Sequence, residues 1–416
     1  MLDTLLRTTA SARSRASHAP HALAVALLFS CFVPARGGAQ SQPDPFATAR
    51  HRSGPLAINP SLSIVDAGVD SNVFNDVANP KQDVTTAFRP AADIWLRAGR
   101  ARLTAKTQLS YNYFKQYASE RYVGTDNRLR FELRGPRVTP FGTVSFLSTR
   151  DRISPEVDAR VRRDEWTAGL GADVELGGRV TARLSGRHFE TSYNQTTGVG
   201  GFAAALNRRE NQAAAAVRYR LTPLTTVVTE VTRETSRFVF ATERDANAVA
   251  VLPGVEFNSL ALITGSGVLG YRRFDFLDPR LKDFQGMVGA LDLTYVLRGA
   301  TRFGVTADRN VENSFELEQP YYVSSGYGAR LTQQVTERWN AACGISRRTL
   351  DYRAALPLLR VQPRTDRVLY LNGSLGGRIS ARTRTEFTAA YQRRSSVQLR
   401  REFDGLRIGG ALFYEF

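Results

Sequence analysis

Cysteine and histidine are scarce in this chain. Its 416 residues include two cysteines, Cys31 and Cys343, and four histidines. We expect Cys31, His18 and His21 to be removed with an N-terminal segment, which leaves Cys343 without an intrachain disulfide partner. The two remaining histidines form no cluster that could ligate a metal. The composition therefore argues against a disulfide scaffold and a metal centre, and we expect no cofactor.

Long apolar runs are also missing beyond the N-terminus. A transmembrane helix needs about 18 or more consecutive apolar residues, and no such stretch follows residue 40. The N-terminus itself has Arg7, Arg13 and Arg15, then an apolar segment at 22–33, then small residues at 37–39. This order predicts a secretory signal peptide of the Sec type over residues 1–39.

An alternative reading of the signal involves Cys31. The segment "LFSC" (28–31) loosely resembles a lipobox, in which the cysteine is lipidated. Phe29 fits this motif poorly, and apolar residues continue beyond Cys31. We therefore favour cleavage near Gln40.

Acidic residues are too few to balance the basic ones. The chain has 56 Lys and Arg against 39 Asp and Glu, a formal net charge of +17. Such an excess favours an anionic partner, which could be a lipid headgroup, an acidic solute or a nucleic acid. We expect no nucleic-acid partner, because the basic residues are dispersed along the chain and do not gather on one patch.

The dispersed charges follow a two-residue period. In "RLTAKTQLSYNYF" (102–114), apolar and small residues such as Leu103, Leu109 and Tyr111 alternate with polar ones. This is the pattern of a strand with one apolar face. The strand is longer than the roughly five or six residues usual in globular proteins, and long enough to cross a membrane.

The same alternation returns at 166–176, 212–221, 339–347 and 379–392. Longer polar segments between such strands alternate with short turns. The turns are expected near residues 98, 134, 176, 221, 257, 297, 335 and 375. This pattern predicts an all-β, transmembrane, antiparallel up-and-down β-barrel of about 18 strands, with short periplasmic turns and longer extracellular loops.

The barrel is expected to span residues 56–416 and to follow a periplasmic linker at 40–55. The location would be the outer membrane of a Gram-negative cell. A secreted β-sandwich or solenoid is the alternative, but neither requires strands this long.

The last strand alternates in the same way. Leu412, Tyr414 and Phe416 fall on its apolar face, with two aromatic residues at the end. We expect these residues to meet the membrane at an aromatic girdle. A terminal aromatic strand also resembles the signal read by the barrel assembly machinery, so that machinery and outer-membrane lipid are expected partners.

Several segments carry a resemblance to a known family. "GVDSNVF" (68–74), "ALITGSGVLGYRRFDF" (261–276), "TADRNVENS" (306–314) and "ALFYEF" (411–416) look like the outer-membrane family called putative β-barrel porin 2. The resemblance covers the chain from about residue 55. It implies a barrel fold and, because such genes often accompany exopolysaccharide genes, a role in surface-polysaccharide export.

A barrel of about 18 strands encloses an aqueous lumen, so strand parity predicts which charges line it. The expected basic residues are Arg102, Lys106, Arg128, Arg130, Arg134, Arg183, Arg187, Arg218, Arg220, Arg302, Arg330, Arg382 and Arg384. The expected acidic ones are Glu132, Asp173, Glu175, Glu230, Glu234, Asp292, Asp308 and Glu386. The basic excess predicts a porin-like channel with weak preference for anionic solutes. The alternatives are a paired ladder that only holds the wall in shape, and a component that secretes acidic polysaccharide.

Catalysis is the remaining alternative function. His188 is the one histidine within a predicted strand, and a dyad with Ser185 or Ser192 is conceivable, since dyads are recognised by geometry. No phosphate-binding glycine loop opens a helix, because "GVGG" (198–201) lies in an expected loop. We therefore expect no enzyme activity.

Overall fold

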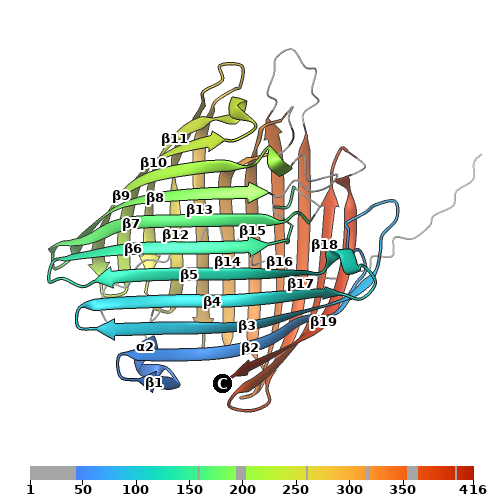
Figure 1. The fold of residues 1–416 in the computed structure, drawn as a ribbon, viewed down its shortest axis with the longest axis horizontal. Coiled ribbons are helices and arrows are strands. Elements are labelled where there is room, and N and C mark those ends of the chain that lie inside the picture. The colour runs from blue at the N-terminus through green and yellow to red at the C-terminus, as the bar shows by residue number, and fades with distance from the viewer. Residues whose placement is uncertain are drawn as a thin grey trace, which may run out of the picture.

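The computed structural model describes residues 44–152, 154–156, 160–193, 203–258, 261–314, 316, 319–353, 364–398 and 401–416. Strands β2 to β19 form a closed antiparallel barrel of 18 strands, because each pairs with the next and β19 pairs with β2 (Figure 1). This confirms the predicted fold class. In Figure 1, β3 to β8 of one wall run almost crosswise to β15 to β17 of the other, as tilted barrel strands do.

The strands are 12 to 16 residues long, more than the roughly nine to eleven that a membrane crossing requires. They are β2 (Leu56–Asp70), β3 (Asp83–Ala98), β4 (Ala101–Phe114), β5 (Tyr122–Leu133), β6 (Val138–Thr149), β7 (Arg163–Gly177), β8 (Val180–Tyr193), β9 (Arg208–Thr222), β10 (Thr225–Phe238), β11 (Ala246–Phe257), β12 (Ile263–Phe276), β13 (Phe284–Leu297), β14 (Thr301–Asn313), β15 (Tyr321–Gln334), β16 (Trp339–Arg353), β17 (Thr365–Arg378), β18 (Thr383–Ser395) and β19 (Phe403–Glu415).

Short connections and long connections lie at opposite ends of the barrel, which we call the turn end and the loop end. At the turn end, β3 and β4 are joined through Gly99, whose φ is +57°, and β13 and β14 through Gly299, whose φ is +72°. Glycine adopts these left-handed conformations at no steric cost, which permits such tight turns. Two short 3-10 helices, η2 (Ala118–Glu120) and η3 (Thr242–Arg244), lie in loops at the loop end.

One predicted turn is wrong. The segment 375–378 was expected to reverse the chain, but it lies within β17, and the turn between β17 and β18 is 379–382. Its backbone closes through Ile379 N donating to Thr383 O at 2.9 Å, and Ser380 Oγ accepts from Thr383 N at 3.1 Å. Gly377 serves packing instead, because a Cβ there would lie 2.6 Å from the Trp339 ring.

The closing seam between β2 and β19 contains an irregularity. The register of β2 against β3 shifts between Val65 and Gly68, and Asp66 in between has a φ of 58°. A Cβ at Gly68 would lie 2.0 Å from the carbonyl oxygen of Ile408. Glycine therefore permits β2 to approach β19 closely enough to close the barrel.

The described part of the predicted linker lies against the turn end. It forms the short helix α2 (Pro45–Thr48) and the strand β1 (His51–Ser53), which pairs with residues 56–58 of β2. Arg50 also reaches β19, since its Nη2 lies 2.6 Å from Glu415 Oε2. In Figure 1, α2 and β1 lie near the C-terminus. No helix in the described residues is long and apolar enough to cross a membrane.

Candidate channel lumen and its mouth

The two faces of the barrel wall differ in chemistry. Residues paired across a ladder lie on the same face, and one face carries exposed apolar side chains such as Leu170, Leu184 and Phe387. The opposite face carries most of the ion pairs within the strands, including Arg183–Asp173 at 2.6 Å. A membrane barrel exposes its apolar face to lipid, so the charged face lines the lumen.

Strand register places most of the basic residues predicted to line the lumen on this charged face. Arg102, Lys106, Arg128 and Arg130 lie on β4 and β5, opposite in parity to the exposed Leu109 and Leu129; Arg218, Arg220, Arg330 and Arg384 follow the same rule on β9, β15 and β18. Arg382 instead lies in the turn 379–382, so it is not part of a strand wall.

Many basic residues on the lumen face are paired with a carboxylate. Arg128 lies 2.8 Å from Asp126, Arg130 lies 2.6 Å from Glu132, and Lys106 lies 3.1 Å from Asp93. Nearer the loop end, Arg348 lies 2.6 Å from Asp308 and Arg272 lies 3.2 Å from Glu234. All of these pairs cancel charge. The two pairs of Arg128 and Arg130 lie within β5, whereas the other three join different strands.

Near the turn end some arginines lack such a partner, although Arg183, close to the start of β8, is paired with Asp173. Arg220, Arg302, Arg330 and Arg384 have no carboxylate within 4.0 Å among the described residues. Arg384 lies instead over the ring of Phe413, 4.9 Å from its centroid. Arginines without a carboxylate partner therefore gather near the turn end, as do the carboxylates Glu175, Asp292 and Glu386, for which no ion pair is found among the described residues.

The loop end of the lumen is crossed by a buried polar network. Arg394 projects from β18 toward the loop between β6 and β7, where its Nη1 donates to the carbonyl oxygens of Pro155 and Glu156, both at 3.0 Å. Its Nη2 lies 2.6 Å from Asp366, which also pairs with Arg364 at 2.7 Å. These residues lie on strands and loops far apart in the sequence, so the network ties distant parts of the rim together.

A second part of the network centres on the loop between β14 and β15. Ser314 Oγ donates to Glu156 Oε1 at 2.5 Å. Glu316 accepts from Arg364 at 3.1 Å and from Arg401 at 2.7 Å. The loops after β6 and β14 are thus linked to each other and to the rim at β17 and β18, a set of contacts that the sequence did not predict.

Arg244, in η3, supports the same loop. It donates to the backbone carbonyl oxygens of Ser314 and of Glu316, the latter at 2.9 Å. Burial lowers the pKa of the Arg244 guanidinium from its ordinary value, because desolvation penalises its charge. The carbonyl acceptors offset part of that cost.

An apolar cluster lies beside the network at the loop end. Phe276 and Tyr321 stack with their ring centroids 5.3 Å apart, and Tyr321 Oη donates to the carbonyl oxygen of Lys282 at 3.0 Å. Phe274, Phe284 and other buried side chains complete the cluster. Such packing favours a fixed position for the chain around the β14–β15 loop.

The histidine considered for catalysis lies on the outer face. His188 pairs in register with Asn211, and its Nδ1 lies 2.8 Å from Asn211 Oδ1. Ser185 has the opposite parity, and no hydrogen bond joins His188 to Ser192 among the described residues. Nor do the described residues contain a group of acidic, histidine or cysteine side chains that could hold a metal ion.

The sequence matches the family described as putative beta-barrel porin 2 over residues 44–412. Comparison with curated proteins gives no match. Among solved structures, the fold is similar to Pseudomonas aeruginosa OprD, with 9% identity, a TM-score of 0.49, and coverage of 89% of this chain and 97% of that one. P. aeruginosa OccK2 (OpdF), solved in complex with glucuronate, has 10% identity, a TM-score of 0.49, and coverage of 86% and 98%. A BenF-like porin from Pseudomonas fluorescens Pf-5 has 9% identity, a TM-score of 0.48, and coverage of 87% and 98%.

Proposed function

The chain belongs to the putative β-barrel porin 2 family and is a porin-like channel of the outer membrane, and we propose that its lumen weakly prefers anionic solutes. The observation that carries this proposal is the group Arg220, Arg302, Arg330 and Arg384, none of which has a carboxylate within 4.0 Å among the described residues. Pore-lining basic side chains raise the local concentration of anions.

Arg302 and Arg330 are the most favourable pair within this group. Arg330 pairs in register with Gly304, two residues beyond Arg302 on β14, so the two arginines are diagonal neighbours on one face. Gly304 and Gly344 flank Arg330 on the adjoining strands and carry no side chain that could cover it. An anion at this position would contact two guanidinium groups at once.

The preference is weak because the rest of the lumen is largely balanced. Nearer the mouth, basic residues such as Arg272 and Arg348 are each held by a carboxylate, at 3.2 Å and 2.6 Å. Such pairs contribute little net charge to the path of an ion. The selectivity of the channel is therefore set mainly at the turn end.

The test is a charge reversal at that end. Reversal potentials measured in planar bilayers under a salt gradient should show anion preference for the native channel, and a shift toward cations for the double variant Arg302→Glu, Arg330→Glu. The matched control replaces Arg183 with Gln and Asp173 with Asn, which removes a lumen ion pair without changing net charge. An unchanged reversal potential in the double Glu variant would contradict the proposal.

Secretion of an acidic surface polysaccharide is the second candidate function. The observation that favours it is the buried network at the loop end, since loops held across the mouth by Glu156, Asp366 and Arg394 suit a channel that opens only for its cargo. This function predicts negligible steady conductance of the purified protein and loss of surface polysaccharide when its gene is deleted. Steady conductance together with an intact polysaccharide coat would exclude it.

A further inference from the structure

Three arginines lie on the outer wall of the barrel, on the face that meets lipid. Arg347, Arg367 and Arg393 are exposed and have the parity of the exposed Ile345 and Leu375. Their strands, β16, β17 and β18, are adjacent, and all three residues lie in the half of each strand nearer the loop end. We propose that this triad binds the phosphate groups of a phosphorylated lipid in the outer leaflet of the membrane.

Register places the three side chains together. Leu369 pairs with Arg347 on one side and with Arg393 on the other, so these two arginines share one rung of the ladder. Arg367 lies on the next rung toward the loop end, paired with Thr349 and Ser395. It is therefore a diagonal neighbour of both. Diagonal positions on a sheet lie about 7–8 Å apart, within reach of long side chains.

The triad is not satisfied within the protein. Among the described residues, none of its members has a carboxylate within 4.0 Å or a side-chain hydrogen bond. Asp404 lies opposite Arg393 in register but is not within ion-pair distance of it. The arrangement leaves three guanidinium groups available to an external anion.

Their sequence neighbours on the opposite face of the wall are paired. Arg348 and Arg394, one residue further along, point to the lumen, where each lies 2.6 Å from a carboxylate. Asp366, next to Arg367, is completely buried against Arg364 and Arg394. These two inward arginines thus have acidic partners, whereas the three outward ones do not; further along β16 toward the loop end, the outward Arg353 is paired with Asp351 at 2.6 Å.

An apolar surface adjoins the triad on the side of the turn end. The next outward rung consists of Ile345, Leu371, Tyr391 and Leu406. Arginine on a lipid-facing wall costs little near the interface but about 2–4 kcal/mol at the midplane. The triad therefore fits the headgroup level of the leaflet, with acyl chains against the rung below it. A lipid phosphate at this level would accept bidentate hydrogen bonds from guanidinium groups.

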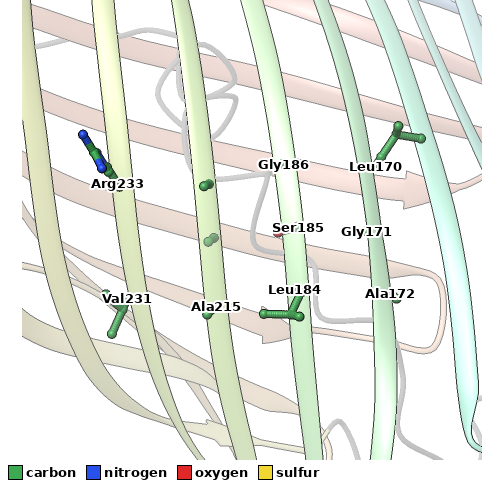
Figure 2. Close-up of a pocket in the computed structure, with 11 residues that line it drawn as sticks. Leu170, Gly171, Ala172, Leu184, Ser185, Gly186, Ala215, Val231 and Arg233 are labelled. Atoms are coloured by element: carbon green, nitrogen blue, oxygen red, sulfur yellow. The ribbon is translucent and has the colours of Figure 1, made fainter.

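A single outward arginine also borders an apolar part of the wall at β7 to β10 (Figure 2). An apolar hollow of about 650 Å³ on the outer wall is lined by Leu170, Leu184, Ala215 and Val231. Arg233 borders it on the side of the loop end, exposed and without a carboxylate within 4.0 Å among the described residues. An outward arginine beside apolar wall is thus a repeated feature, and it accommodates a charged headgroup with an adjoining acyl chain.

Lipid A carrying two phosphates is a suitable probe, titrated against the purified barrel in detergent and followed by native mass spectrometry. The triple variant Arg347→Gln, Arg367→Gln, Arg393→Gln should bind it about tenfold or more weakly, the loss expected for one or more charge-assisted hydrogen bonds. The matched control, Arg137→Gln, Arg179→Gln, Arg338→Gln, makes the same charge change at the turn end and should bind like the native protein.

Two further binding measurements identify the chemical group that the triad recognises. Dephosphorylated lipid A should bind the native barrel no better than it binds the triple variant, and inorganic phosphate alone should not compete. Equal binding of phosphorylated lipid to the native barrel and the triple variant would overturn the proposal, as would full competition by inorganic phosphate, which would mark a site for free anions. If the triple variant fails to assemble, the three single Gln variants provide the same comparison, and binding undiminished in all three would likewise overturn it.

Discussion

Arg394 and Asp366 form an ion pair of 2.6 Å in which neither side chain is exposed to solvent. The pair joins β18 to β17, and Arg394 continues to the backbone of Pro155 and Glu156 in the loop after β6. A buried pair contributes less to stability than its short distance suggests, because both ions are desolvated. The pair matters because removing one partner leaves the other charge buried and unpaired, which is strongly destabilising.

The substitution Asp366→Ala tests this consequence. It leaves Arg364 and Arg394 without their shared carboxylate, and breaking a buried pair typically costs about 3–5 kcal/mol. We expect the folded band of the heat-modifiable gel shift to disappear at a lower urea concentration than in the native protein. The urea concentration of this transition is the measurement. The exposed pair Asp351–Arg353, at 2.6 Å, provides the control, because Asp351→Ala should leave the transition almost unchanged. Equal transitions for the two variants would show that the buried pair is dispensable.

Opening of the mouth is tested at Glu316. Its carboxylate accepts from Arg364 at 3.1 Å and Arg401 at 2.7 Å, so Glu316→Ala should release the β14–β15 loop from β17. We expect higher single-channel conductance than in the native protein. Glu337→Ala, which removes an exposed carboxylate at the turn end, should not alter it. A conductance unchanged by Glu316→Ala would place the constriction elsewhere.

The N-terminal segment should detach in acid. A hydrogen bond from Arg97 holds the pKa of Asp44 below its ordinary value, so the contact stabilises the attached segment at pH values above that ordinary range. The stabilisation is lost as the pH falls through the lowered pKa of Asp44. A spin label at Ala47 should therefore become mobile in acid, and Asp44→Asn should mobilise it at neutral pH. A label equally immobile in both proteins and at both pH values would contradict this.

Assembly should depend on the terminal aromatic residue. Phe416 N donates to the carbonyl oxygen of Pro60 at 3.2 Å, and its ring meets that of Tyr414 edge to face at 4.9 Å. Deleting Phe416 should lower the amount of heat-modifiable protein in the outer membrane, because the closing strand loses an interfacial aromatic. The substitution Phe416→Tyr keeps an aromatic ring and should assemble normally. Normal assembly after the deletion would show that the residue is incidental.

The barrel could be predicted because the alternation of apolar and polar residues is a local pattern within each strand. Lipid selects apolar residues at every second position, so the segment 102–114 reveals its strand without knowledge of its neighbours. The turn expected at 375–378 shows where local signals fail. Gly376 and Gly377 are typical of a turn, but in the structure they give room to Asn340 and Trp339 on the adjacent strand, a requirement visible only once the strands are paired.

The mouth network could not be predicted for the same reason. Arg394 and the carbonyl of Glu156 are 238 residues apart in sequence, and nothing local to either indicates the other. Parity places Arg394 on the lumen face but does not reveal its partners. The only sequence signal is the adjacent pair Arg393 and Arg394, in which one arginine must face lipid and the other the lumen.

The central claim is that unpaired arginines at the turn end give the lumen its ionic preference. The most direct measurement is the reversal potential of the native channel in a planar bilayer under a potassium chloride gradient. The account predicts a reversal potential shifted from zero toward the equilibrium potential of chloride. The shift should be modest, because many lumen charges are paired. A reversal potential shifted toward the equilibrium potential of potassium would contradict it.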